Sequence, residues 1–204
     1  MMALAMRGGF PARSGGVPAP LDPSVMRRCR GQDPVAFRAF VVRYERMVFA
    51  LLSRMLGPGA EIEDLAQETF VRAYRALPTF DPDGPAKVST WLLTIATRLA
   101  LDARKRRRVA VDPIDVHADL AGPGTPERSL ERRELGDALS AAADLLPDDQ
   151  RAALVLAELH GFSIAEIAAA LEIPENTAKT RLFRAREKMR AALQARLGED
   201  WRTT

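Results

Sequence analysis

The side chains whose types and spacing could do chemistry in this sequence are mostly cations, and they gather at two places. The first is a run of five consecutive cations: Arg104, Lys105, Arg106, Arg107 and Arg108. Such a run is too costly to bury, and at the end of a helix it complements the helix dipole. Each charge that neutralises a phosphate also releases counterions. The run therefore predicts a helix end that can bind a nucleic-acid backbone, although a merely solubilising segment has the same pattern.

The second group lies near the C-terminus and has helical spacing: Thr177, Thr180, Arg181, Arg184 and Lys188. An arginine fork that meets guanine in the major groove is worth about 1–3 kcal/mol of discrimination. Contacts with phosphates, by contrast, position a protein without specifying sequence. An ordinary solvated helix with a basic face is the alternative on this pattern alone.

A helical hairpin is expected to carry this second group. Ser163 and Glu166 have the spacing of a capping box, and Gly161 suits the left-handed end of the preceding helix. Pro174 suits the first turn of the next helix. An apolar stripe with 4-3-4 spacing marks the buried side of that helix: Ala178, Leu182, Ala185 and Met189. Residues 161–190 therefore predict a helix-turn-helix whose second helix enters a DNA major groove.

The charge distribution also favours nucleic-acid contact through one C-terminal element. The net charge is only +3, although the pI is about 9.4. Within residues 137–204, nine Lys and Arg stand against eleven Asp and Glu, and every cation except Arg151 lies at or beyond Lys179. An acidic body with one basic helix indicates nucleic-acid contact through that helix, and not the nonspecific binding of a generally basic protein.

The sequence speaks against catalysis, metal binding and membrane insertion. His117 lies in a predicted linker and His160 at a predicted helix end, and neither has a second histidine or a carboxylate cluster for a metal site or an acid–base pair. The single cysteine, Cys29, excludes an internal disulfide and is interpreted as an ordinary thiol in a terminal segment. No apolar run approaches the roughly 18 residues of a membrane span, and the N-terminus lacks the apolar core of a signal peptide. We expect a non-enzymatic, cytoplasmic protein without cofactor or metal.

Three helices are expected in the N-terminal half, over residues 35–56, 60–77 and 90–107. Asp33 and Pro34 supply a cap and a first-turn proline for the first of them, where ordered structure is expected to begin. On the second, the buried side is predicted from apolar spacing: Ile62, Leu65, Ala66, Thr69, Ala73 and Leu77. On the third it comprises Trp91, Leu92, Ile95, Leu99 and Ala103.

Another face of the second predicted helix carries Asp64, Gln67 and Glu68 together with Val71. A polar stripe interrupted by an apolar residue is typical of a protein-binding face, but scattered exposed apolar residues are common on solvated helices as well. Periodicity alone leaves these two interpretations open.

The overall expectation is an all-α protein of two small helical domains joined by a flexible linker. The predicted parts are a disordered tail (1–24), a first domain (25–108), the linker (109–133), a helix-turn-helix domain (134–197) and a short tail (198–204). A flexible coil of about 25 residues spans roughly 25–30 Å. It would let the two domains occupy separate sites on one DNA.

Three stretches together resemble the extracytoplasmic-function class of bacterial sigma factors. They are EDLAQETFVRAYRAL at 63–77, STWLLTIATRLALDARKRRR at 89–108, and LPDDQRAALVLAELHGFSIAEIAAALEIPENTAKTRLFRAREKM at 146–189. The resemblance implies that the first domain is sigma region 2, which melts and reads the −10 promoter element, and that the last is region 4, which reads the −35 element. Arg98 stands where the family often has Asn, and Asn176 and Ala178 stand where Gly and Val are common, so the exact promoter sequence does not transfer.

The resemblance also implies partners and contacts. Core RNA polymerase is expected to bind through its β′ clamp helices and β flap, with the region 2 contacts on this chain being Asp64, Gln67, Glu68 and Arg72. Promoter DNA is expected to meet region 2 at Arg98 and at the five-cation run. The family pattern for the −35 element implies region 4 contacts at Thr177, Lys179, Thr180, Arg181 and Arg184. By the same resemblance, Arg181 is the first candidate for a guanine contact, and Lys179 and Arg184 are candidates for phosphates. An anti-sigma factor is a further implied partner. The alternative from another class is a stand-alone helix-turn-helix regulator that binds duplex DNA without polymerase.

Overall fold

The computed structural model describes residues 18–57, 59, 61–82, 84, 86–109 and 126–197, and within these ranges the chain is helical with no strand. The tail predicted at 198–204 and most of the tail predicted at 1–24 lie outside the described residues, as do residues 110–125 of the predicted linker. In the described part, no helix is both long enough and apolar enough to cross a membrane. The all-α prediction is confirmed.

The first helix, α1 (Pro23–Arg30), precedes the point at which ordered structure was expected to begin. Asp22 caps it by accepting a hydrogen bond from the amide of Ser24 at 2.8 Å. This Asp-Pro pair repeats the cap-and-proline signal of the next helix, and the expectation overlooked it. Met26 and Cys29 are buried against the helices that follow, so the thiol belongs to the core rather than to a loose terminal segment.

Helices α2 (Pro34–Leu56), α3 (Glu61–Ala76) and α4 (Val88–Val109) pack against one another and form the body of the N-terminal half. Asp33 caps α2, because its carboxylate accepts hydrogen bonds from the amides of Val35 and Ala36 at 2.8 and 3.1 Å. A 3-10 turn (Leu77–Thr79) follows α3. Every residue predicted for the buried side of α3 is buried, and of the five predicted for α4, Trp91 and Ile95 are only partly buried.

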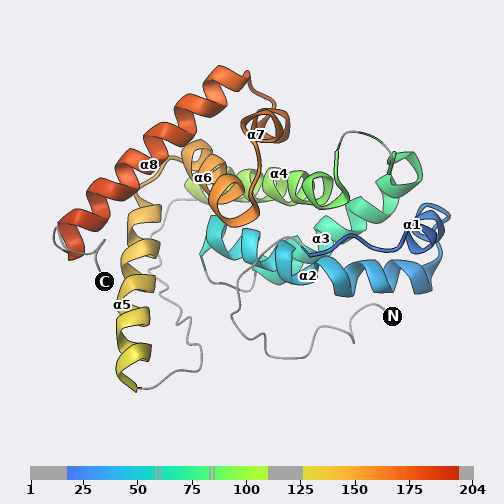
Figure 1. Cartoon of the computed structure of the whole chain (residues 1–204), viewed down its shortest axis with the longest axis horizontal. Coiled ribbons are helices and arrows are strands. Elements are labelled where there is room, and N and C mark those ends of the chain that lie inside the picture. The colour runs from blue at the N-terminus through green and yellow to red at the C-terminus, as the bar shows by residue number, and fades with distance from the viewer. Residues whose placement is uncertain are drawn as a thin grey trace.

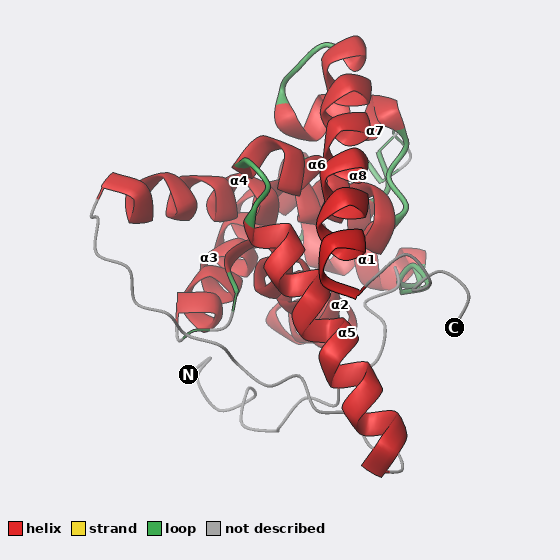
Figure 2. Ribbon diagram, turned by 90° about the vertical axis from the view of Figure 1, so that its left-hand side faces the viewer, coloured by secondary structure: helices red, strands yellow, loops and turns green. Residues whose placement is uncertain are grey.

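Helix α5 (Pro126–Asp144) begins eight residues before the helix expected from Glu134 and takes up part of the predicted linker. Pro126 suits a first helical turn, a signal that the lack of apolar periodicity in this segment obscured. The second half of α5 packs on α8 through a small apolar cluster of Ala138, Ala142 and Leu193. The helix extends away from the rest of the molecule (Figures 1 and 2).

The C-terminal helices are α6 (Asp148–His160), α7 (Ile164–Leu171) and α8 (Glu175–Leu197). The predicted capping box is confirmed: the Glu166 amide donates to the Ser163 hydroxyl at 3.2 Å, and the Ser163 amide donates to the Glu166 carboxylate at 2.8 Å. Gly161 ends α6 with φ +67°, the left-handed conformation that its lack of a Cβ favours. Helices α7 and α8 are therefore the two helices of the predicted helix-turn-helix.

The two helical halves are packed directly against each other. Helices α2 and α4 contact α6 and α7, and α6 and α7 lie beside α4 in Figure 1. One apolar cluster continues from α1–α4 into α6, α7 and the start of α8. The two-domain organisation is thus accompanied by a shared core, which the sequence did not predict.

Candidate nucleic-acid interface

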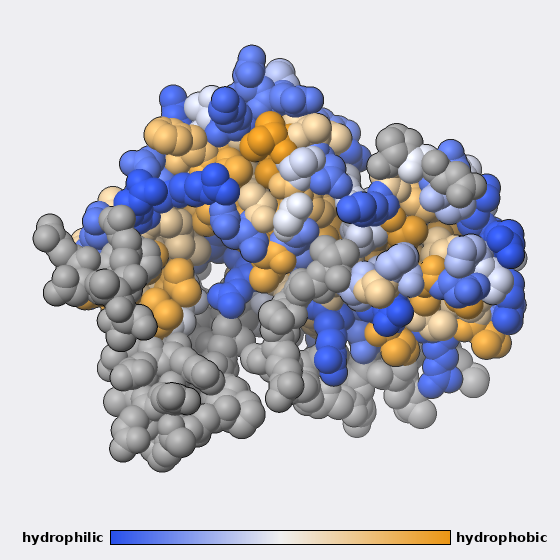
Figure 3. Space-filling model, viewed as in Figure 1, coloured by the Kyte–Doolittle hydropathy of each residue, from blue (hydrophilic) through white to orange (hydrophobic). Residues whose placement is uncertain are grey.

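Helix α8 presents the candidate DNA-reading side chains on the faces that flank its packed stripe. Ala178, Leu182 and Ala185 are buried against α6 and α7, and hydrophilic residues line the outer edge of the face formed by α7 and α8 (Figure 3). Lys179, Thr180 and Arg184 are exposed, whereas Thr177 is half-buried. The fold thus brings the five candidates together on one helix.

Arg181 differs from the other candidates on α8 because it already has an anionic partner. Its Nε lies 2.9 Å from the Asp149 carboxylate at the start of α6, and its side chain is mostly covered. In the part of the chain that the structure describes, Arg184 forms no ion pair. Of the two arginines, Arg184 is the one whose guanidinium is free to approach a base edge.

Phe183 is a surface residue on α8 that the sequence reasoning overlooked. Its side chain is 64% exposed, and it lies one helical turn from Lys179 and Thr180. A bare aromatic ring beside basic residues fits apolar contact with a thymine methyl in a major groove. The signal available in the sequence was an aromatic residue outside the apolar stripe.

Three arginines at the cationic end of α4 are paired with carboxylates of other helices. Arg104 and Arg108 both pair with Asp148 of α6, Arg108 at 2.8 Å. Arg107 pairs with Glu61 of α3 at 2.6 Å and donates to the carbonyl of Leu56 at 2.8 Å. Lys105 and Arg106 are exposed. The sequence interpretation of a solvated run is therefore wrong for Arg104, which is only 19% exposed.

Arg98, one and a half turns before this run, is also paired across the two halves. Its guanidinium lies 2.8 Å from the carboxylate of Glu172, the residue that ends α7 with φ +54°. Near the start of α4, the Thr90 hydroxyl lies 3.1 Å from the Glu166 carboxylate of α7. Two positions on α4, Thr90 and Arg98, thus face acidic side chains of the helix-turn-helix.

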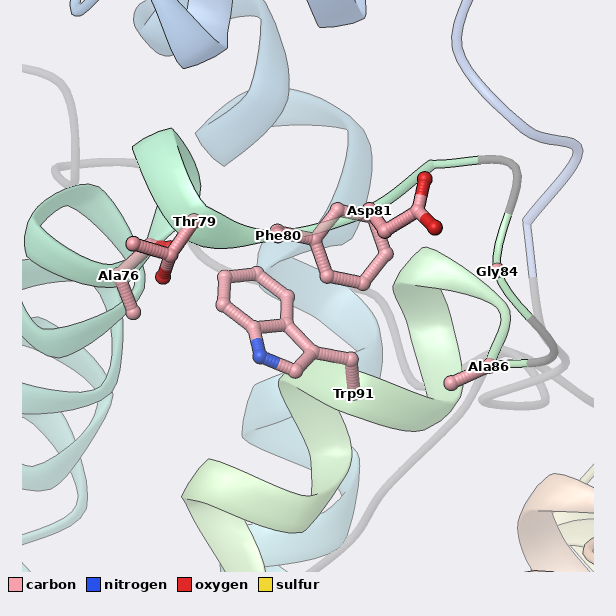
Figure 4. A pocket seen from close by; sticks show the side chains of 7 residues that line it. All are labelled: Ala76, Thr79, Phe80, Asp81, Gly84, Ala86 and Trp91. Atoms are coloured by element: carbon pink, nitrogen blue, oxygen red, sulfur yellow. The ribbon is translucent and has the colours of Figure 1, made fainter.

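A shallow pocket of about 320 Å³ lies where the loop after α3 meets α4. The rings of Phe80 and Trp91 are 4.7 Å apart and tilted by 37°. The Trp91 indole lies between the Phe80 ring and the end of α3, where Ala76 and Thr79 line the other side (Figure 4). Trp91 is half-buried, so it contributes to the core and still presents part of its ring to the pocket.

The polar face of α3 is a separate surface. Asp64, Gln67 and Arg72 are exposed and Glu68 is half-buried, with Arg72 donating to the Glu68 carboxylate at 2.7 Å. None of these four residues pairs with a described residue of α5–α8. The structure leaves this face of α3 uncovered by the helix-turn-helix.

Two protein-family models match the chain, and together they span both helical halves. Sigma-70 region 2 matches residues 40–109, which include α3 and α4. Sigma-70, region 4 matches residues 136–189, which include the helix-turn-helix.

Curated relatives of similar length are RNA polymerase sigma factors. The RNA polymerase sigma-H factor of Pseudomonas aeruginosa is 35% identical over 188 residues, which cover 87% of this chain and 96% of the relative. The ECF RNA polymerase sigma-E factor of Escherichia coli K12 is 36% identical over 176 residues, covering 81% and 91%.

Solved structures agree in fold. The structure of CnrH in complex with the cytosolic domain of CnrY matches with a TM-score of 0.60 and 28% identity, over 84% of this chain and 96% of CnrH. The sigma factor RpoE of Bartonella quintana, in complex with the anti-sigma factor NepR, matches with a TM-score of 0.59 over 78% and 96%, and at 23% identity supports the fold alone. The chain belongs to the extracytoplasmic-function group of the sigma-70 family, the subunits that direct RNA polymerase to promoters.

Proposed function

We propose that this sigma factor binds core RNA polymerase through α3, reads the −35 element through α8, and melts and holds the −10 element at α4 and the loop before it. The observation that carries the proposal is the geometry of α8, whose apolar stripe is fixed against α6 and α7 while Lys179, Thr180 and Arg184 face outward. A helix held in this way is the reading helix of a helix-turn-helix.

On the −35 element, the side chains of α8 divide into two roles. Arg184 and Arg181 are the candidates for a bidentate contact with guanine, the second after it leaves Asp149. Lys179 and the hydroxyls of Thr177 and Thr180 suit backbone phosphates, which set the register of the helix in the groove. Phe183 adds apolar contact with a thymine methyl.

At the −10 element, the pocket beside Trp91 is suited to an unpaired base. Single-stranded nucleic acid is held by stacking on aromatic rings together with backbone charge. Phe80 and Trp91 supply the rings, and Arg98 and the run at 104–108 supply the charge. A flat pocket of this kind traps a strand that has already left the duplex, which favours melting.

The exposed face of α3 is the proposed site for the β′ clamp helices. Asp64, Gln67, Glu68 and Arg72 offer anionic, amide and cationic groups on two adjoining turns. A stand-alone regulator has no use for such a face, so this surface favours a polymerase subunit over the alternative of a free DNA-binding repressor. The β flap is the proposed partner of region 4.

A protein inhibitor is a further proposed partner. CnrH, which this chain resembles over most of its length, was solved with the cytosolic domain of CnrY. We therefore propose that an anti-sigma factor binds this chain and blocks polymerase. The protein acts in the cytoplasm, where polymerase works, and catalyses no reaction of its own.

Reconstitution with core RNA polymerase tests the proposal. Core polymerase, this protein and genomic DNA fragments are mixed, and transcripts are mapped to find start sites that depend on the protein. We expect a set of starts sharing −10 and −35 sequences, and loss of those starts when Arg184 is replaced by Ala. Transcripts that are the same with and without the protein would contradict the function.

A further inference from the structure

Helix α2 carries a second apolar stripe on its solvent side. Most of its bulky apolar residues are buried in the core. On the opposite side of the helix, Val35 is 70% exposed and Val42 is 59% exposed. Ala39, which lies between these valines, is exposed too, and so is Arg46, one turn after Val42. We call these four residues the outer stripe of α2. A single exposed apolar residue is common on protein surfaces, but two valines on one line of a helix form a continuous contact surface.

The outer stripe has the spacing of a coiled-coil seam. Its members follow one another at intervals of four, three and four residues, which keeps them on one side of a helix. Two helices pack along such a seam when the side chains of each fill the holes of the other. Arg46 occupies a seam position, where a polar or charged residue fixes the register of the pair. The stripe therefore fits one further helix that places a carboxylate beside Arg46.

The charge around the outer stripe defines the chemistry of that helix. Helix α2 contains one acidic residue, Glu45, which is half-buried, and four exposed arginines: Arg38, Arg43, Arg46 and Arg54. None of these arginines forms an ion pair with a described residue. Arg38 and Arg43 border the stripe on its two sides, and charges in those positions select the partner of a helical seam. Cations on both sides select an acidic partner.

Other occupants fit the outer stripe less well. A second copy of this chain would bring the same arginines face to face, and like charges across an interface cost several kcal/mol. DNA phosphates would meet the arginines but would make no use of the valines. Helices that lie on a membrane insert bulky side chains such as Trp, Phe and Leu, whereas this stripe offers two valines and an alanine.

We propose that the outer stripe of α2 docks an acidic amphipathic helix of another protein. Apolar residues of the partner lie on the two valines, and its carboxylates pair with Arg38, Arg43 and Arg46. Helix α2 lies along the lower edge of the molecule in Figure 1, whereas α7 and α8 lie at its upper side. The partner therefore leaves the reading helix uncovered. This inference goes beyond the proposed function and does not depend on it.

A designed peptide tests the chemistry of the outer stripe on the full-length chain. The probe is a fluorescent helix of about three heptads with Leu along its seam, one Glu within the seam and Glu on both sides of it. In the control peptide every Glu is replaced by Gln. Fluorescence anisotropy is expected to show at least about tenfold tighter binding of the acidic peptide. Equal affinity for the two peptides would overturn the proposal.

Variants of α2 locate the binding of this probe. Arg46→Gln removes a charge and Val42→Ser removes an apolar contact, and each is expected to lower the affinity at least about fivefold. The matched control is Arg54→Gln, which removes an exposed arginine of the same helix that lies off the stripe, and it is expected to change the affinity less than about twofold. Equal effects of Arg46→Gln and Arg54→Gln, or no effect of Val42→Ser, would mean a general polyanion surface and would refute a helix site.

Cross-linking in cells tests whether a natural occupant exists. The photoreactive residue benzoylphenylalanine replaces Ala39 in the full-length chain, and the cross-linked segment is identified by mass spectrometry. We expect a segment of another protein with acidic residues around an apolar helical stripe. Its yield is expected to fall at least about fivefold when Arg43→Glu and Arg46→Glu are introduced together. A cross-link only to a second copy, to nucleic acid, to lipid or to residues 110–125 of the same chain would contradict the proposal, and so would the absence of any cross-link at this position.

Discussion

Arg181 is held by Asp149 at 2.9 Å, so on a promoter it exchanges a carboxylate for a base or a phosphate. Replacing Arg181 by Ala is expected to cost about 1–3 kcal/mol at one −35 position and to relax the preference there. Replacing Lys179 by Ala is expected to weaken binding to all −35 sequences alike. The slope of log affinity against log salt concentration is expected to fall by about one. Holoenzyme binding to a set of −35 variants at several salt concentrations measures both.

A suitable control for these substitutions is Arg196→Ala, which removes an exposed cation from the last turn of the same helix. It is expected to change neither the preferred sequence nor the salt dependence. If Arg181→Ala lowered binding to every −35 variant by the same factor, Arg181 would be a phosphate contact and not a base reader.

His160 is a buried histidine whose ring nitrogens make no hydrogen bond within the described part of the chain. Burial lowers its pKa to about 4 from an ordinary value of 6.5. Between these two values the unfolded chain binds more protons than the folded one, so the free energy of unfolding falls as the pH is lowered. We expect a loss of about 2 kcal/mol between pH 7.5 and pH 5, measured by urea unfolding at each pH.

The substitution His160→Leu isolates this effect, because it removes the titrating group and fills the buried site with an apolar side chain of similar size. The variant is expected to lose most of the pH dependence in that window. The carboxyls of Asp22 and Asp33 do not interfere there, since hydrogen bonds from amides and side chains near them lower their pKa values below 3.8. An unchanged slope in the variant would place the titration elsewhere.

At the scale of elements, α3 offers the sharpest test, because its buried and exposed faces have different tasks. Gln67→Ala and Asp64→Ala change exposed side chains that contribute little to packing, so the melting temperature is expected to stay within about 2 °C of the wild-type value. Core polymerase binding is expected to fall by tenfold or more, because truncating a central interface contact costs at least about 1.4 kcal/mol. Binding to immobilised core polymerase, with Glu63→Ala as the control on the same helix, measures this.

Most elements could be predicted from the sequence because each carries its own local signal. The capping box at Ser163 and Glu166, the Asp-Pro start of α2 and the apolar stripes of α3 and α8 depend on neighbours within one or two turns. Helix α1 and the start of α5 were missed although the same kind of signal, Asp22-Pro23 and Pro126, was present. These helix-start signals were overlooked because the segments around them are rich in Gly, Pro and Ala.

At the scale of the whole molecule, the sequence could not predict which cations would be paired. Arg104 and Arg108 read as part of a solvated run, yet Asp148, some 40 residues later, neutralises both. Arg151 stood alone as the one cation in an acidic segment, and nothing local indicated that Met55 would accept its hydrogen bond. Pairings of this kind depend on how helices meet, which no periodicity within one helix encodes.

The shared core leads to a prediction about unfolding. Because one apolar cluster includes residues of both halves, we expect the wild-type chain to unfold as a single cooperative unit, with calorimetric and van't Hoff enthalpies in agreement. Differential scanning calorimetry measures both enthalpies. A calorimetric enthalpy clearly larger than the van't Hoff enthalpy would mean that the halves melt separately and would contradict the prediction.

Because Cys29 is buried, the rate at which a thiol reagent labels it reports local opening of the protein. It is the one cysteine in the chain, it is fully buried between α1 and the body of the molecule, and burial raises the pKa of its thiol. A thiol reagent can reach it only in molecules whose first helix has detached, so the rate of labelling counts those rare excursions. Labelling that is unchanged when core polymerase is added would mean that α1 stays in place in the holoenzyme, whereas faster labelling would mean that docking loosens it.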